Sequence, residues 1–493
     1  VKMGSLDNGI SYYIKKNAIP ANRITLRLII QTGSAMEEDS EKGVAHFIEN
    51  LAFNGTEHFE KSAIVDYFEK IGMNCGSDLN AETDFENTVY KLEIPADDPA
   101  ILDTAMQIFH DWSCAISFDP EEIDKERGVI VEEWRLRQNL NGRLLEKYVE
   151  VLLKDSRFQN RLAIGDMDII KNISREEIIN FYKKWYRPEL ISIVVAGDIE
   201  PSVMEKSIKK NMGSIPASET KSVKPVYEVP VPSEKSITIM KDPEQSYNQI
   251  FIFEPVPDWE ARKTEEDIQR IYTQQIASEI FNSRMNEITA TAESPWLAAG
   301  CADISLTHMT LNNYLAVFPK PGMTEVAMKK FFDEVDKFLV FGVTESEFNR
   351  VIKSLQSQSE LTYQNKDKIE NSTIAGRLAS YVFVGKVLMS AEDVRKVDNK
   401  VLPRITVEMV TEEARRLFSN RGTSMLILAP EKEKLPAEKE LMSVWKDYKN
   451  TQLTAYQDDV SDDNFMSKPS KKAKIVSKNE NKTLGTKDYV LDN

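Results

Sequence analysis

The stretch Gly43–Thr56 reads GVAHFIENLAFNGT, and the rest of the chain is best interpreted outward from it. Within it, His46, Glu49 and Asn50 stand at positions i, i+3 and i+4. On an α-helix these positions share one face, so the three side chains point into one small volume. An imidazole and a carboxylate brought together in this way can hold a metal ion, and the alternative is an ordinary core or surface helix, on which this spacing is common by chance.

The spacing corresponds to the inverted zincin motif HxxEH, with Asn50 in place of the second histidine. In that motif two histidines hold Zn²⁺ and the glutamate between them activates the zinc-bound water. An amide oxygen is a poor zinc ligand beside an imidazole or a carboxylate. The stretch therefore predicts a zinc peptidase scaffold whose metal site lacks one strong ligand.

Three further segments resemble the pitrilysin/insulinase family of metallopeptidases. His58-Phe59 follows the first stretch, DLNAET occupies residues 78–83, and ERGVIVEEWR occupies residues 126–135. The chain is most similar to the bacterial long-chain zinc proteases of this family, which consist of two halves. The resemblance implies a zinc-dependent metalloendopeptidase that cleaves peptides or unfolded proteins inside an enclosed chamber, in the bacterial periplasm or cell envelope.

By this resemblance, four side chains form the metal site. His46 is the first zinc ligand and Glu49 is the general base, while Asn50 occupies the position of the second ligand. Glu133 is the third ligand and comes from a separate helix. With His46 and Glu133 as the only strong ligands, we expect zinc affinity to fall by orders of magnitude.

The same resemblance assigns supporting residues. Glu126 precedes Glu133 by two helical turns and is expected to orient a ligand from behind. Glu132 is the rival third ligand, although a regular helix points it elsewhere, and a solvated acidic helix face is the alternative for this whole segment. Asn80 and Ala81 are expected to meet the backbone of a peptide that adds as an edge strand. The alternative for them is an ordinary turn before a strand.

Two functions follow from the replaced ligand. The first is a metalloendopeptidase impaired by Asn50, and the second is a non-catalytic pseudo-peptidase that acts as a peptide-binding or scaffold subunit. Asn50 is compatible with a natural change and with one introduced to trap substrate. Restoring histidine at this position is the experiment that separates the two functions.

The composition is that of a globular protein. The chain has 493 residues, of which 41% are hydrophobic and 29% are charged. A net charge of −16 argues against a nucleic-acid partner. No apolar run approaches the roughly 20 residues that span a bilayer, so a soluble protein without a membrane span is expected. Cys75, Cys114 and Cys301 show no CxxC spacing and are expected to be buried thiols.

The order of strands and helices predicts an α+β fold with two homologous domains. Each is expected to be a mostly antiparallel sheet covered by helices on one face. We place the peptidase-like domain at 1–215, a proline-rich linker at 216–235 and a second, non-catalytic domain at 236–448. A long helical stretch is expected from Pro120 towards Leu153.

The remaining residues, 449–493, are polar and are expected to form a flexible linker. They end in Leu491-Asp492-Asn493, which repeats Leu6-Asp7-Asn8 near the start. We therefore hypothesise that a second homologous half, in the same chain or as a subunit, follows and closes the chamber.

Overall fold

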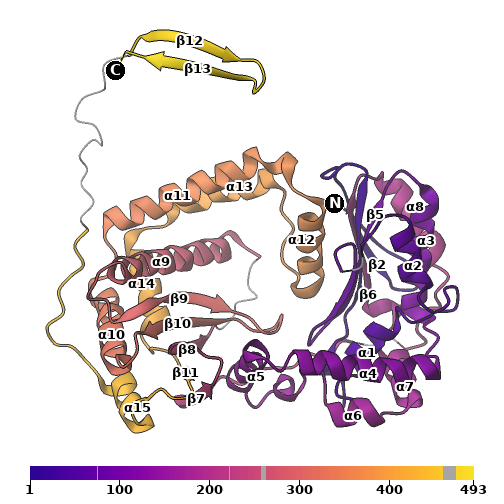
Figure 1. Cartoon of the computed structure of the whole chain (residues 1–493), viewed down its shortest axis with the longest axis horizontal. Helices are drawn as coiled ribbons and strands as arrows, with labels where there is room; N and C mark the ends of the chain where they lie inside the picture. The colour runs from indigo at the N-terminus through magenta and orange to yellow at the C-terminus, as the bar shows by residue number, and fades with distance from the viewer. Residues whose placement is uncertain (75, 221–222, 257–262, 459–472, 493) are drawn as a thin grey trace. The chain divides into compact units, whose positions relative to one another are not determined.

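The computed structural model describes residues 1–74, 76–220, 223–256, 263–458 and 473–492. The chain divides into two compact units, Val1–Ala455 and Tyr456–Asn493. The first unit holds two β-sheets with their helices (Figure 1), which confirms the predicted fold class. The linker expected at 216–235 contains no helix or strand among its described residues.

The first sheet has six strands. In spatial order they are β1 (Lys2–Ser5), β2 (Ser11–Lys16), β6 (Ile191–Gly197), β3 (Arg23–Ile30), β5 (Thr88–Pro95) and β4 (Leu79–Thr83). Strands β2 and β6 are parallel, and every other neighbouring pair is antiparallel. The sheet therefore ends at β4, whose outer edge pairs with no described strand.

The second sheet repeats this plan with five strands. In spatial order they are β7 (Ser236–Asp242), β11 (Ser424–Pro430), β8 (Gln249–Pro255), β10 (Asn312–Pro319) and β9 (Trp296–Ile304). Strands β7 and β11 are parallel, as β2 and β6 are in the first sheet, and the other neighbouring pairs are antiparallel. The repeat predicted from the order of elements is thus confirmed, and β9 is the counterpart of β4.

Fifteen helices accompany the sheets among the described residues. The first half contains α1 (Val44–Leu51), α2 (Ala63–Lys70), α3 (Pro99–Cys114), α4 (Pro120–Leu136), α5 (Leu140–Leu152), α6 (Met167–Asn172), α7 (Arg175–Trp185) and α8 (Pro201–Met212). The second half contains α9 (Glu265–Thr289), α10 (Thr324–Phe341), α11 (Glu345–Gln364), α12 (Asn371–Val384), α13 (Ala391–Val401), α14 (Val407–Phe418) and α15 (Glu438–Asp447).

The long helical stretch expected from Pro120 towards Leu153 consists of two helices, α4 and α5. Helix α4 ends at Leu136, and the side chain of Asn139 accepts a hydrogen bond from the backbone N–H of Gly142 to begin α5. Asparagine favours this capping position because its side chain satisfies a backbone donor that has no partner within the helix.

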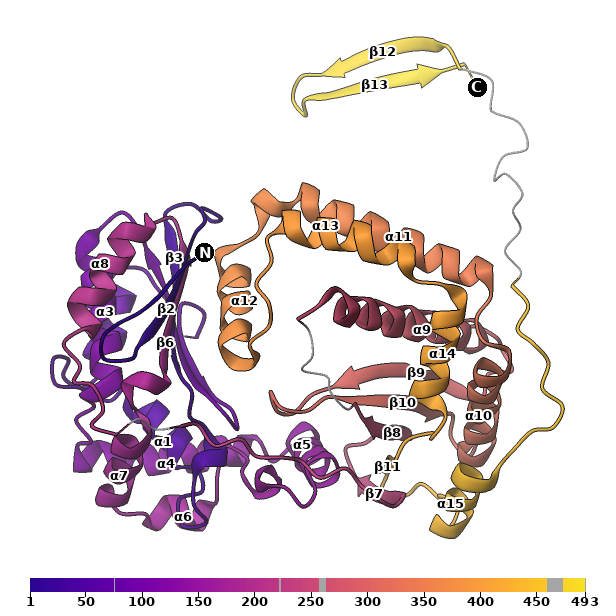
Figure 2. The same ribbon diagram turned by 180° about the vertical axis from the view of Figure 1, so that it is seen from behind.

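Helices cover both faces of each sheet, so the expectation of one covered face was wrong. Along β8, Ile250 and Ile252 pack into the core of the second half, while Phe251 and Phe253 pack on the opposite face with residues of α5. Helix α12 of the second half packs on the first sheet, on the face that points away from the main core of the first half (Figure 1, Figure 2). Helix α5 of the first half therefore packs on the second sheet, and helix α12 of the second half packs on the first sheet.

The second unit contains a β-hairpin inside the segment that was expected to be a flexible linker. Strands β12 (Ile475–Asn481) and β13 (Thr486–Leu491) pair antiparallel, and all their residues are exposed. The β-branched and aromatic residues Val476, Tyr489 and Val490 supply strand propensity that the overall polar composition conceals.

Two further expectations concern cysteines and membrane spans. Cys114 is exposed at the end of α3 and Cys301 is partly buried on the edge strand β9, so the prediction of buried thiols was wrong for Cys114. Cys75 lies outside the described residues. Across the described part of the chain, none of the helices combines the length and the apolar character that a membrane span requires.

Candidate active site

Helix α1 is held from its amino-terminal end by a buried carboxylate. The two oxygens of Glu37 accept hydrogen bonds from the backbone N–H groups of Gly43 and Ala45, both at 2.9 Å. Gly43 has a φ of 99°, a backbone conformation that side chains with a Cβ rarely adopt. These hydrogen bonds therefore hold the start of the helix that carries His46 and Glu49 without the help of a ligand.

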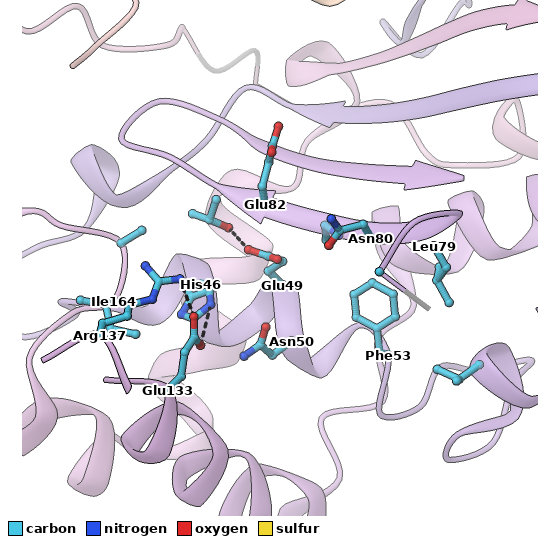
Figure 3. Close-up of a pocket in the computed structure, with 15 residues that line it drawn as sticks. His46, Glu49, Asn50, Phe53, Leu79, Asn80, Glu82, Glu133, Arg137 and Ile164 are labelled. Carbon is cyan, nitrogen blue, oxygen red and sulfur yellow. Dashed lines mark hydrogen bonds and ion pairs between the residues drawn. The ribbon is translucent and has the colours of Figure 1, made fainter. Parts of the chain in front are cut away.

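His46 and Glu133 meet although they lie 87 positions apart in the sequence. Helix α1 packs against α4, and His46 Nε2 lies 3.4 Å from Glu133 Oε2 (Figure 3). Bonds of about 2.0–2.2 Å to a tetrahedral zinc ion place a nitrogen and an oxygen ligand roughly 3.3 Å apart. These two side chains therefore already have the separation that a shared metal ion requires.

Asn50 stands beside this pair without completing it. Its Nδ2 donates a hydrogen bond to Glu126 Oε1 at 3.1 Å, and the neighbouring Asn54 donates to Glu126 Oε2 at 2.6 Å. Glu126 thus lies behind Asn50, where the sequence placed it. Among the residues that the structure describes, no three His, Cys, Asp or Glu side chains are arranged to hold a metal. The residues therefore fit zinc at two positions and not at the third.

Glu49 is a buried carboxylate on the same helix face. Thr83 Oγ1 donates a hydrogen bond to its Oε2 at 2.5 Å. Burial raises the pKa of Glu49 to about 7, although the Thr83 bond opposes that rise. Burial also lowers the pKa of His46, so this imidazole is neutral near pH 7. Glu49 is accordingly a group that can take up or release a proton at neutral pH.

One cavity of about 460 Å³ unites these groups. Its lining includes every predicted site residue except Glu126, which lies behind it: His46, Glu49, Asn50, Asn80, Ala81 and Glu133. Glu132 is not part of the lining and pairs with Arg135 on the exposed side of α4. The structure thus brings the predicted residues together and places the rival ligand elsewhere.

The cavity opens beside the free edge of β4. The backbone N–H of Glu93 donates to the carbonyl of Asp78, and that of Asp84 donates to the carbonyl of Asn87. Because hydrogen bonding alternates along an antiparallel strand, residues 78, 80, 82 and 84 bond to β5, and residues 79, 81 and 83 face the free edge. Ala81 therefore presents its backbone to the edge, where its N–H is accepted by the Asn80 side chain at 2.8 Å.

Three residues at the site were not predicted. Thr83 bonds to Glu49, Glu37 holds α1, and Arg137 lines the cavity and donates to Glu133 Oε1. Arg137 follows Glu133 by four residues, which is the spacing of helical neighbours, so this partner could have been found from the sequence. The partners of Thr83 and Glu37 depend on how the chain folds and carry no comparable local signal.

Two models of one protein family together match most of the first unit. The family described as insulinase (peptidase family M16) matches residues 12–164, and the M16 inactive domain matches residues 172–355. The chain is 30% identical over 437 residues to a probable zinc protease PqqL of Haemophilus influenzae, covering 87% of this chain and 46% of that protein. It is 28% identical over 459 residues to the probable zinc protease PqqL of Escherichia coli, covering 92% and 49%.

A solved structure extends this likeness to three dimensions. The crystal structure of the first half of the periplasmic protease PqqL from Escherichia coli superposes with a TM-score of 0.86 at 27% identity. The match covers 92% of this chain and 98% of that one. The chain spans about half the length of the curated relatives it matches.

Proposed function

The chain belongs to the insulinase family of peptidases, family M16, and we propose that it is a zinc metalloendopeptidase of this type whose metal site is impaired by Asn50. One observation carries the proposal. His46 and Glu133 keep the separation of two zinc ligands, while the residue beside them is an amide that donates its N–H to Glu126. A carboxylate behind a ligand is the partner that a zinc-bound imidazole ordinarily has.

The peptide side of the site supports binding of an extended chain. The backbone groups of Ala81 and Thr83 face the free edge of β4, so an unfolded segment can pair with them as an added strand. Main-chain pairing recognises peptides with little sequence preference, which suits unfolded proteins as substrates. A second homologous half or subunit would close the chamber around them, and we place the protein in the bacterial periplasm or envelope, as for the Escherichia coli relative.

The chain's own residues account for proton handling and substrate placement. Glu49 lies in the cavity with a pKa near neutrality, so it can accept a proton from a nucleophile and return it to a leaving amine. Thr83 links the two tasks, because its hydroxyl holds Glu49 while its backbone faces the edge that a peptide would occupy.

A second candidate is a pseudo-peptidase that binds peptides without cutting them. The observation that favours it is that the carboxylates of the site already have partners within the chain. Asn50 and Asn54 satisfy both oxygens of Glu126, and His46 and Arg137 flank both oxygens of Glu133. The carboxylate oxygens of Glu126 and Glu133 thus have partners without a metal ion.

The two candidates are separated by the variant Asn50→His. We would measure zinc bound per chain after dialysis at defined pH, and hydrolysis of an unfolded protein with and without the second half supplied. Asn54→His is the matched control, because Asn54 also contacts Glu126 but does not line the cavity.

The impaired peptidase predicts that Asn50→His binds about one zinc ion and hydrolyses the substrate, while the native chain and Asn54→His do neither. Zinc binding without hydrolysis, even with the second half present, would favour the pseudo-peptidase. Failure of Asn50→His to bind zinc would contradict the metal-site interpretation itself.

A further inference from the structure

The turn that joins β4 to β5 is held from both halves of the first unit. From the first half, the backbone N–H of Ser34 donates to the carbonyl of Asp84 at 3.0 Å. From the second half, the turn is met by His308, which lies in the connection between β9 and β10. The end of the strand whose free edge borders the cavity is therefore a point of contact between the two halves.

His308 makes three contacts at this place. Its Nε2 lies 3.0 Å from Asp84 Oδ2, and its backbone N–H donates to Glu86 Oε2 at 2.5 Å. Its ring also stacks on that of Phe383 in α12, with centroids 4.6 Å apart and an angle of 26° between the planes. Glu86 is only 5% exposed, so its carboxylate accepts a hydrogen bond from the second half where little water can reach it.

The residue that faces the His308 ring is the one that shapes the turn. Asp84 Oδ1 accepts hydrogen bonds from the backbone N–H groups of Glu86 and Asn87, at 2.6 and 2.7 Å. An aspartate that bonds to the backbone in this way stabilises a tight turn. Its second oxygen, Oδ2, is the one turned to His308. The Asp84 carboxylate thus connects the backbone of the turn to the second half.

This turn begins where the peptide-binding edge ends. Asp84 directly follows Thr83, whose backbone faces the free edge of β4 and whose hydroxyl donates to Glu49. Strand pairing requires donor–acceptor distances of about 2.7–3.2 Å, so a small shift of the turn would weaken pairing at Thr83. The position of the edge therefore depends on what holds the turn.

We propose that His308 of the second half is a positioning residue for the edge at which peptides pair: through Asp84 it holds the end of β4, and with it the backbone of Thr83, in place. The inference rests on the proposed function for the peptide edge and involves no metal ion. It gives the second, non-catalytic half a role in peptide binding.

A general contact between the halves is the alternative, and the chain supplies a matched control for it. The Arg143 guanidinium of α5 bonds to both carboxylate oxygens of Asp242 on β7, at 2.6 and 2.9 Å. Neither residue is among those that line the cavity beside β4. Arg143→Gln therefore removes a contact between the halves away from the β4 edge, and any effect of loosening the two halves in general will appear in this variant.

Two variants separate the nitrogen of His308 from its ring. His308→Phe keeps a ring to stack on Phe383 and loses the Nε2 contact with Asp84, whereas His308→Gln loses the ring and keeps an amide donor. Affinity for a labelled, unstructured peptide is measured by fluorescence anisotropy. His308→Phe should weaken binding about three- to tenfold, the range of one hydrogen bond, and His308→Gln should recover most of this loss. Arg143→Gln should bind as the native chain does.

Three results would overturn the proposal. The first is native affinity in His308→Phe, and the second is an equal loss of affinity in Arg143→Gln. The third is a loss in His308→Gln without one in His308→Phe, because it would assign the effect to stacking on Phe383 and not to the contact with Asp84.

A second test needs no peptide. Hydrogen exchange over residues 79–87, followed by mass spectrometry, should be faster in His308→Phe than in the native chain and close to native in His308→Gln. If the native chain binds no peptide, the proposed function of the edge is contradicted, and this exchange still decides whether His308 holds the turn. Unchanged exchange in His308→Phe would show that it does not.

Discussion

Proline substitutions at two adjacent positions of β4 are expected to have opposite consequences. The backbone N–H of Ala81 faces the free edge of the sheet, whereas that of Glu82 faces β5. Proline removes the N–H group and is tolerated in a sheet only where that group faces away from the ladder. Ala81→Pro should therefore impair peptide binding with little effect on folding, and Glu82→Pro should impair folding.

The magnitudes follow from the number of hydrogen bonds that each change removes. Ala81→Pro deletes the N–H donor that an added strand would take over from the Asn80 side chain and puts a ring at the edge, a loss of about 1–2 kcal/mol of binding free energy, or roughly 5- to 30-fold in affinity. Glu82→Pro deletes a ladder bond and leaves the carbonyl of Val89 unpaired, so the free energy of unfolding should fall by about 2–4 kcal/mol.

The assay pairs a binding measurement with a stability measurement. Fluorescence anisotropy of a labelled, unstructured peptide reports affinity for the edge, and urea unfolding reports stability. Ala81→Val serves as the matched control, because it enlarges the side chain and keeps the N–H group.

Two results would refute the reasoning. If Ala81→Pro bound the peptide as tightly as Ala81→Val does, the free edge of β4 would not be where peptides pair. If Ala81→Pro destabilised the protein as much as Glu82→Pro, the alternation of backbone groups inferred from the register would be incorrect.

Further predictions concern the support of the site and the two halves. Burial raises the pKa of Glu37 to about 8, so the folded state keeps this proton more tightly than the unfolded chain; the resulting stabilisation is complete below about pH 4.5 and is lost as pH rises to 8. Glu37→Gln should therefore flatten the decline of urea-unfolding stability between pH 6 and 8, and an unchanged slope would contradict this. Arg284→Met leaves the Glu347 carboxylate buried without its bidentate partner and should cost about 3–5 kcal/mol in thermal or urea unfolding, with recovery when Glu347 is also made apolar. Leu378→Ala, on α12, should cost about 2–4 kcal/mol and should lower hydrogen-exchange protection in the first sheet, against which Leu378 packs; loss confined to the second half would contradict the exchange of helices.

Much of the candidate site could be predicted because its signals are local. His46, Glu49 and Asn50 share a helix face by spacing alone, and the resemblance to a peptidase family supplied Glu133 and Glu126 from a second helix. The structure places all five together. Their catalytic and metal-binding roles stay predictions, and the zinc and hydrolysis measurements above test them.

The partners of these residues were less predictable. Thr83 reaches Glu49 only because β4 lies beside α1, and Glu37 reaches the start of α1 only because the intervening turn folds back. Hydrogen bonds of this kind depend on positions in space that no sequence period encodes. The break between α4 and α5 was missed for a different reason, because the helical pattern on both sides of Asn139 concealed a capping residue.

Taken by itself, the sequence determined most strands and helices of the two halves, the repetition of the strand plan, and the face of α1 that carries the chemical groups. Hydrophobic period and side-chain spacing are properties of neighbouring residues. Only the tertiary structure decided which sheet each apolar helix covers. Helix α5 of the first half packs on the second sheet, and helix α12 of the second half packs on the first sheet. The tertiary structure also turned one edge of β4 towards the cavity and set His46 opposite Glu133, because contacts between distant segments depend on the packing of the whole unit.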